Sequence, residues 1–208
     1  LALALPESLA ALFPTRLVDS PLGEVPEGWK VVAFGDFIKR LPVGEKYEQK
    51  TVFPSGAVPV LDQGKSGVIG FHNEKPGVVA TPDAPVAVFA NHTCYMRLLP
   101  FSFSTIQNVL PFVGDGVDTY WAYYATEGRL AFSEYKGHWP DFVMQQATVP
   151  PPALTEAFGR VVKPLLARVW NNERQSATLA ALRDTLLPKL ISGELRIADA
   201  QRIVERAV

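Results

Sequence analysis

The sequence predicts an α+β protein in which a β-rich globular domain is followed by one long α-helix. Two observations support this fold class. Between about residues 30 and 150 the chain consists of short runs rich in Val, Ile and Phe, separated by Gly, Pro, Asn and Asp, which is typical of short strands joined by turns. After residue 152, apolar residues recur every three or four positions, the spacing of one helix face. Such a face needs a surface to pack against.

Composition limits the class of protein. The chain has 208 residues, 48% of them hydrophobic, so a packed core is expected. No apolar run approaches the roughly 18–20 residues that span a bilayer. Cys94 is the single cysteine, which excludes an internal disulfide framework and favours a reducing, cytoplasmic location.

The charge balance differs along the chain. Residues 1–150 carry 11 Lys and Arg against 15 Asp and Glu, a net charge of −4, whereas residues 151–208 carry 9 against 6, a net charge of +3. Non-specific attraction to phosphates is therefore weak in the first part, and any DNA contact there needs a local cluster of residues.

The elements of the domain follow from its turn residues. Residues 1–20 are expected to hold a short helix that ends before the irregular stretch FPTRLVDS. A turn at Pro26 and Gly28 presents Trp29 and leads into a strand in WKVVAFGDFI. One helical interruption is expected at 118–132, where aromatic residues and Ala recur at helical spacing.

The long helix is expected to begin after the prolines at 150–152, with Thr155 or a neighbour as its N-cap and Pro164 either in its first turn or at a kink. From Leu165 to Leu187 it would be roughly 35 Å long. Pro188 is expected to break or kink this helix, and Ser192 and Gly193 are expected to supply the C-cap at its end.

A seam of residues at 3-4 spacing marks one face of this helix. Its polar members, Asn172, Ser176 and Arg183, are expected to set register or partner choice. The residues expected to form the helix interface are Val162, Leu165, Val169, Leu179, Leu182, Leu186 and Leu190.

Three loops are candidates for binding. DQGKSGVIG lacks the spacing of a phosphate-binding loop and indicates a hairpin, with or without a reading function at its tip. EYKGHWPDFV interleaves aromatic and cationic residues, which fits either a nucleic-acid surface or satellite core. KRLPVGEKYEQK is a basic run that fits either a phosphate-binding patch or a solvated loop.

Evidence for catalysis is sparse. His72, His92 and His138 lack the spacing of a metal site. His92 and Cys94 would share one face if they lay on a strand, which permits a nucleophilic pair or simply a buried cysteine beside a polar histidine.

Four stretches resemble the specificity (S) subunit of type I restriction-modification enzymes. The match spans nearly the whole chain, and its last stretch is the most specific. The third departs from the family, which usually has an acidic or glutamine-containing helix start after the prolines. The stretches are LFPTRLVDSPLGEVPEGWKVVAFGDFI, FANHTCYMRLLPFSFSTIQNVLPF, YKGHWPDFVMQQATVPPPALTEAFGRVV and LAALRDTLLPKLISGELRI.

The resemblance implies a domain plan. Residues 21–152 would form a target recognition domain, and residues 153–197 a conserved helical arm. Residues 1–20 would be the tail of a preceding conserved region, and residues 198–208 a C-terminal tail. Complete S subunits carry two such domains and two conserved helices that pair antiparallel. This chain therefore corresponds to half a subunit, either a C-terminal half or a natural half-subunit that dimerises through its helix.

The resemblance also implies a function: non-catalytic recognition of one half of a bipartite double-stranded DNA site. Adenine methylation and cleavage would belong to partner methyltransferase (M) and restriction (R) subunits, which use S-adenosylmethionine and ATP-Mg²⁺, so no cofactor and no membrane contact are expected of this chain. Residue chemistry and loop position, rather than the family, select the expected DNA contacts. These are Lys46, Lys50, Gln63, Lys65, Ser66, His92, Thr93, Lys136 and His138.

Two alternatives remain open from the residues alone. The chain fits a β-rich ligand-binding module with a dimerisation helix and no DNA role, or a hydrolase built on Cys94 and His92.

Overall fold

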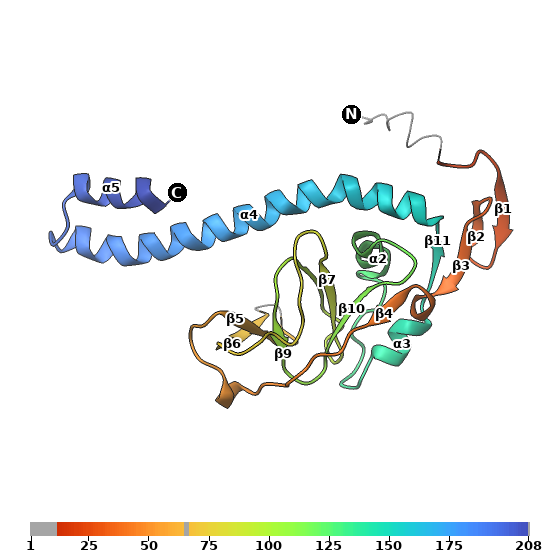
Figure 1. Cartoon of the computed structure of the whole chain (residues 1–208), viewed down its shortest axis with the longest axis horizontal. Coiled ribbons are helices and arrows are strands. Elements are labelled where there is room, and N and C mark those ends of the chain that lie inside the picture. Colours follow the sequence, from red (N-terminus) through yellow and green to blue (C-terminus); the bar gives the residue numbers. More distant parts are fainter. Residues whose placement is uncertain (1–11, 65–66, 208) are drawn as a thin grey trace. The chain divides into compact units, whose positions relative to one another are not determined.

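The computed structural model of this chain describes residues 12–64 and 67–207 and divides into two compact units after Val162. The first unit is rich in strands and the second is helical (Figure 1). This confirms the predicted α+β class, a β-rich domain followed by a long helix. Within the described residues, no helix is both long enough and apolar enough to cross a membrane.

A four-stranded antiparallel sheet forms the centre of the first unit, in the order β4-β10-β7-β8. Strand β7 is buried along its whole length because both of its faces are covered. Val86 and Val88 contribute to one apolar cluster, whereas Phe89 packs on aromatic rings. The strands are β4 (Ile38–Arg40), β7 (Val86–Ala90), β8 (Met96–Leu99) and β10 (Val109–Gly114).

A second, three-stranded sheet has the order β6-β5-β9 and consists of β5 (Val58–Leu61), β6 (Val68–His72) and β9 (Ser104–Thr105). Strands β5 and β6 form the hairpin predicted around DQGKSGVIG. Strand β9 pairs parallel to β5. The two sheets share one apolar cluster, in which Leu61 of β5 lies with Leu99 of β8 and Val109 of β10.

The start of the described chain is a hairpin of β1 (Leu17–Ser20) and β2 (Gly23–Pro26). Irregular chain was expected over β1, and that prediction is wrong because the turn residues close a hairpin: Ser20 Oγ donates to the carbonyl of Gly23 at 2.6 Å. The helix expected within residues 1–20 falls largely on residues 1–11, outside the described residues.

The entry and exit of the domain are paired. The predicted turn before Trp29 is present: its N–H donates to the Pro26 carbonyl at 3.0 Å, and Gly28 takes a φ of +85°. It leads into β3 (Lys30–Ala33), which pairs antiparallel with β11 (Gln146–Val149) at the far end of the domain.

Between Leu12 and Val149, outside the undescribed residues 65–66, the first unit also contains two short α-helices and two 3₁₀ turns. Helix α2 (Thr119–Thr126) lies where a helical interruption was predicted, and Asp118 caps it by accepting the N–H of Tyr120 at 2.8 Å. Helix α3 (Trp139–Met144) falls in a stretch interpreted as a loop, where Pro140 occupies the first turn. The 3₁₀ turns are η1 (Phe34–Asp36) and η2 (Gln49–Thr51).

An aromatic cluster holds α3 to the sheet. The ring of Phe142 is fully buried and lies 4.4 Å from the ring of Phe89, 5.2 Å from Phe34 and 5.9 Å from Phe112, measured between centroids. Burial of an aromatic side chain is worth several kcal/mol, and ring pairs add to it. This cluster therefore supplies much of the packing on the second face of β7.

Helix α4 (Pro152–Ile191) begins earlier than expected and ends directly before the predicted C-cap. Pro164 lies well inside it rather than in its first turn, and the helix continues through Pro188. Thr155 also lies inside the helix: its hydroxyl donates to the Pro152 carbonyl at 2.8 Å and accepts the N–H of Asp118 at 3.0 Å. Thr155 thus joins α4 to α2 instead of capping α4.

The C-terminal stretch, predicted only as a tail, contains a helix. Gly193, with a φ of +77°, ends α4 where the C-cap was predicted, and the N–H of Leu195 donates to the Lys189 carbonyl at 3.0 Å. Helix α5 (Ile197–Ala207) then follows. Packing of α5 on α4 helps to stabilise the last turn of α4 despite the hydrogen bond lost at Pro188.

The aromatic cluster gives a stability prediction. Replacing Phe142 by Ala should lower the free energy of unfolding by about 3–5 kcal/mol, because it removes a fully buried ring and leaves a cavity. Urea unfolding followed by tryptophan fluorescence measures this loss. Tyr135→Ala is the matched control, since Tyr135 is 82% exposed and should change stability little. Equal losses in both variants would contradict the assignment.

Candidate nucleic-acid interface

The loop of the β5–β6 hairpin rests on the turn that follows β7. The side-chain oxygen of Gln63 accepts the N–H of His92 at 2.9 Å, and the Thr93 hydroxyl donates to the Gln63 carbonyl at 2.7 Å. The N–H of Asp62 reaches the Gly67 carbonyl at 3.3 Å and closes the loop. The structure therefore brings together three of the predicted DNA contacts. Two others, Lys65 and Ser66, lie outside the described residues.

The turn at 91–95 is held from three sides through Asn91. Its N–H donates to the Asn108 carbonyl at 2.9 Å, and its own carbonyl accepts the N–H of His138 at 2.8 Å. Its side-chain oxygen accepts the N–H of Trp139 at 2.8 Å. The surface that carries His92 and Thr93 is therefore fixed to β10 and to α3.

His138 is a structural residue rather than a surface contact. Its side chain is 1% exposed, and Nε2 lies 2.9 Å from the carbonyl of Glu134. Its Nδ1 lies 3.7 Å from the carboxylate of Asp141. The expectation that His138 faces DNA conflicts with this burial, which arises because α3 folds the loop back onto the sheet.

Lys136 is half-exposed but already paired. Its Nζ lies 3.2 Å from Glu134 Oε1 and 3.2 Å from Asp141 Oδ2. Hydrogen bonds to these two carboxylates raise the pKa of Lys136, so the ammonium stays charged while its charge is balanced locally. A phosphate would have to compete with both carboxylates for this group.

The loop at 134–139 serves both surface and core, the two interpretations that the sequence left open. Tyr135 is 82% exposed, and its ring lies 4.8 Å from that of His92. Trp139, in contrast, lies 5.5 Å from the ring of Phe142, with the Arg40 guanidinium 5.9 Å from its centroid. Tyr135 and His92 thus offer an aromatic surface beside the hairpin loop, of the kind that stacks on bases or sugars.

The basic run at 39–50 is divided between two places. Arg40 lies on β4, whereas Lys46 lies in the following loop and Lys50 in the 3₁₀ turn η2, and both lysines are exposed. Lys50 pairs with Glu48 at 2.8 Å. Lys46 forms no ion pair with any residue that the structure describes, so its charge is the freer of the two for a phosphate.

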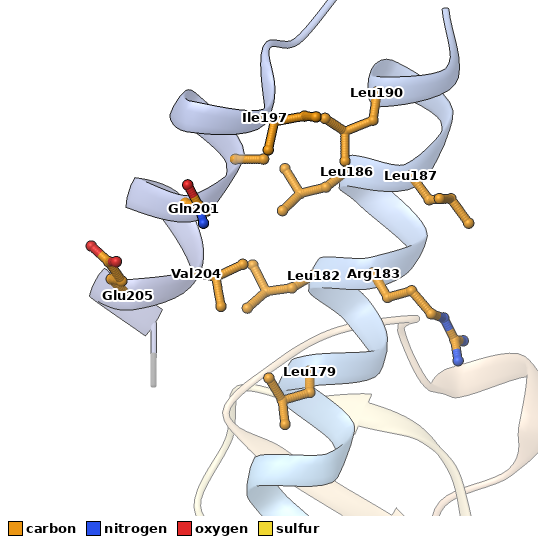
Figure 2. Close-up of a pocket in the computed structure, with 11 residues that line it drawn as sticks. Leu179, Leu182, Arg183, Leu186, Leu187, Leu190, Ile197, Gln201, Val204 and Glu205 are labelled. Atoms are coloured by element: carbon orange, nitrogen blue, oxygen red, sulfur yellow. The ribbon is translucent and has the colours of Figure 1, made fainter.

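The predicted helix interface separates into an exposed part and a covered part. Leu165 is 60% exposed, Val169 46% and Leu179 45%, while Val162 is half-buried. Further along α4, three interface residues instead face α5 of the same chain (Figure 2). These are Leu182, Leu186 and Leu190.

The covered part forms a helical hairpin with an apolar groove of about 470 Å³. Leu186 is only 8% exposed. In Figure 2, Ile197 and Val204 of α5 point toward these leucines, whereas Arg183 and Leu187 point away from α5. Residues 198–208 were predicted as a C-terminal tail, but Ile197–Ala207 form a helix that covers part of the predicted helix interface.

The structure does not support a nucleophilic pair at Cys94. The condition for a shared face, a strand through His92 and Cys94, is not met: both lie in the turn at the end of β7, where Cys94 has a φ of +56°. Burial, and secondarily the charge of Asp141, raises the pKa of the Cys94 thiol. An activated cysteine has a lowered pKa, so this thiol is in the wrong state for a nucleophile.

This pKa gives a prediction for thiol reactivity. Because the thiolate is the reacting species and the native pKa lies above the ordinary 9.0, alkylation of Cys94 near neutral pH should be slower in the folded protein than in the denatured protein. The native rate should rise only at strongly alkaline pH. Iodoacetamide labelling across a pH series, with the chain in denaturant as control, measures this. Rapid native labelling with an inflection below neutral pH would revive the hydrolase interpretation.

Comparison with known proteins connects this geometry to a family. No family model matches the sequence. The type I restriction enzyme MjaIX specificity subunit of Methanocaldococcus jannaschii is 24% identical over 209 residues, which covers 85% of this chain and 46% of that protein.

Solved structures agree with the sequence comparison. The S subunit of the type I restriction-modification system of M. genitalium matches with a TM-score of 0.58 at 19% identity, over 79% of this chain and 46% of that one. A chain from a structure concerned with complex assembly and conformational transition of a type I R-M system matches with a TM-score of 0.51 at 17% identity, over 97% of this chain and 50% of that one. The chain spans about half the length of these relatives. In sequence and in fold, it therefore resembles about half of a specificity subunit of the type I restriction-modification enzymes, as its motifs predicted.

Proposed function

We propose that this chain is the DNA-recognition part of a type I restriction-modification system and that its β-rich domain reads one half of a bipartite site. M subunits would methylate adenine with S-adenosylmethionine, and R subunits would cleave DNA with ATP and Mg²⁺. The chain itself would hold no cofactor and perform no catalysis. Relatives that are specificity subunits support a recognition role rather than an enzymatic one.

The anchoring of the hairpin loop by Gln63 is the observation that carries the proposal. Base edges in the major groove are discriminated by hydrogen bonds of defined geometry, so the side chains that read them must be held in place. The Gln63 contacts hold one end of the loop on the turn that presents Thr93, and Asn91 fixes that turn to the sheet and to α3. A pre-organised surface of this kind suits specific rather than general binding.

The charge distribution sets the expected strength of DNA binding by the isolated chain. Residues 1–150 carry a net charge of −4, and Lys50 and Lys136 are paired with carboxylates. Phosphate contacts supply most non-specific affinity, so the isolated chain should hold DNA weakly. An M subunit would supply the remaining affinity for DNA.

The weak electrostatic attraction of the isolated chain predicts that an M subunit greatly increases its affinity for DNA. A duplex library with a randomised centre, selected with the chain and an M subunit, should yield one preferred site. Titration of that duplex by fluorescence anisotropy should then show weak binding by the chain alone and much tighter binding by the complex. Tight, specific binding by the chain alone would contradict the predicted weakness. Failure to bind DNA in either form would contradict the DNA role and favour a β-rich ligand-binding module.

A variant at Gln63 tests, in the same assay, whether anchoring of the hairpin loop by this side chain contributes to DNA binding. Gln63→Ala removes the side-chain anchor of the loop and should weaken specific binding by about tenfold, roughly the value of one or two hydrogen bonds. Gln49→Ala in η2 is the matched control, because Gln49 makes only a long contact of 3.4 Å to the Ile69 carbonyl. Equal losses of DNA affinity in the two variants would mean that anchoring of the hairpin loop by Gln63 does not contribute to recognition.

The exposed part of α4 is the proposed pairing surface. An apolar stripe that stays in water is unfavourable, and a second copy could cover it by antiparallel pairing. A twofold dimer would place two recognition domains on one DNA and so read a palindromic, interrupted site. The same helix would offer a docking surface for M subunits. This part of the proposal rests on the exposure of Leu165, Val169 and Leu179.

Charges on this stripe should prevent dimerisation. The double variant Leu165→Glu, Val169→Glu should be monomeric in multi-angle light scattering at concentrations where the wild-type chain is dimeric. Ala167→Glu with Thr178→Glu is the control, since both positions lie on the opposite, exposed face of the helix and add the same charge. A wild-type chain that stays monomeric, or a dimer unaffected by the stripe variants, would contradict this surface.

A further inference from the structure

An apolar groove lies in the first unit, between the turn at Trp29, helix α2 and the first turns of α4. It has a volume of about 250 Å³, and the residues that line it are all aliphatic or aromatic. Leu154 in its wall is buried, whereas Val161 is 50% exposed. An open groove of this composition favours an apolar side chain from a partner over water. We call it the Trp29 groove, and the lining residues that matter below are Trp29, Trp121, Leu154, Phe158 and Val161.

The Trp29 groove lies in line with the exposed stripe of α4. Leu154, Phe158 and Val161 lead at 3-4 spacing to Leu165, the first residue of that stripe, so they belong to the same side of the helix. The sequence contained this signal, but the predicted helix interface began only at Val162. A partner that covers the stripe at Leu165 therefore also meets the groove.

The stripe alone is too small for a stable dimer. Its exposed apolar residues are Leu165, Val169 and Leu179, and each of them is already about half-buried in the single chain. Stable protein interfaces bury roughly 1,200–2,000 Å² in total. Three half-exposed side chains from each copy supply only a fraction of this area. A dimer through α4 therefore needs further apolar surface beside the stripe.

Antiparallel pairing places the last turns of a second α4 opposite the Trp29 groove. If Leu165 of one copy faces Leu179 of the other, residues 154–161 face residues 183–190, because each such pair is equally distant from Asn172 along the helix. Position 187 then lies opposite position 157, which is Ala157 in the wall of the groove. The small side chain at this position leaves space for a larger one.

Leu187 is the apolar residue that α5 leaves available at this end of α4. Leu182, Leu186 and Leu190 face α5, whereas Leu187 points away from α5 and is 50% exposed (Figure 2). A leucine on one helix fits between residues spaced three and four apart on the facing helix, as in knobs-into-holes packing. Leu154, Phe158 and Val161 have this spacing in the wall of the groove.

We propose that the Trp29 groove is the docking site for Leu187 and the last turns of α4 of a second copy of this chain. This docking rests on the antiparallel pairing of α4 in the proposed function. A twofold dimer has two grooves and two such helix ends, so the contact occurs at both ends of the stripe. It adds aromatic and aliphatic area to the three stripe residues of each copy. The first unit then takes part in the dimer, in addition to α4.

Cross-linking tests the alignment. In a Cys94→Ser background, the double variant Val161→Cys, Arg183→Cys should form covalent dimers with a short bismaleimide, because the two positions face each other between copies. Within one chain they are about 33 Å apart along α4, too far for the reagent. Val161→Cys alone is the control. Its two copies lie at opposite ends of an antiparallel dimer, so it should not cross-link, and efficient cross-linking by this single variant would overturn the proposal.

A charge at Leu187 tests the docking contact itself. Leu187→Glu should raise the dissociation constant of the dimer roughly 100-fold in sedimentation equilibrium, since each dimer loses two buried leucines. Thr178→Glu adds the same charge on the side of α4 away from the stripe and should change the constant little. A dimer of wild-type affinity in Leu187→Glu, or equal losses in both variants, would overturn the docking and leave the DNA role intact. A monomeric wild-type chain would instead contradict the pairing surface of the proposed function, and the docking with it.

Discussion

The antiparallel pairing of β3 with β11 is the constraint on which the rest of the first unit depends. It joins Lys30 to Val149, so the chain enters and leaves the domain at neighbouring points. Residues 34–145 therefore lie between two strands that pair with each other, and α4 begins directly after the second of them. Thr155 then ties the first turns of α4 to Asp118, the residue that caps α2. Gly159 permits this approach, because a Cβ there would lie 2.5 Å from the Asp118 carboxylate.

Rigidity and recognition are linked through the turn at 91–95. The main chain and side chain of Asn91 join the turn to β10 and α3, while Gln63 joins it to the hairpin loop. The buried ring of His138 belongs to the same support. Polar groups that sequence reasoning would assign to DNA are thus partly used to position other groups.

Local patterns predicted the elements whose signals are local. The 3-4 spacing along α4, the turn at Gly28 and the hairpin at Gly67 were all found from neighbouring residues. Features set by residues distant in sequence were missed. The burial of His138 depends on contacts with Asn91, far away in the chain, and α5 is held by its packing on α4. No periodicity around His138 contains that information. The apolar residues of α5 (Ile197, Ala200 and Val204), in contrast, recur at helical spacing and were an available local signal.

Helix α5 also limits how far two copies of α4 can pair. Because Leu182, Leu186 and Leu190 face α5, the stripe left for a partner extends from Leu165 to Leu179, about 21 Å at 1.5 Å per residue. Asn172 lies at its midpoint. In the proposed antiparallel dimer the twofold axis would pass near this residue, so the two Asn172 amides would face each other. A polar pair at the centre of an apolar seam favours one register over shifted ones, because a shift would bury each amide against leucine or valine. The register of the paired helices would then be set by one residue.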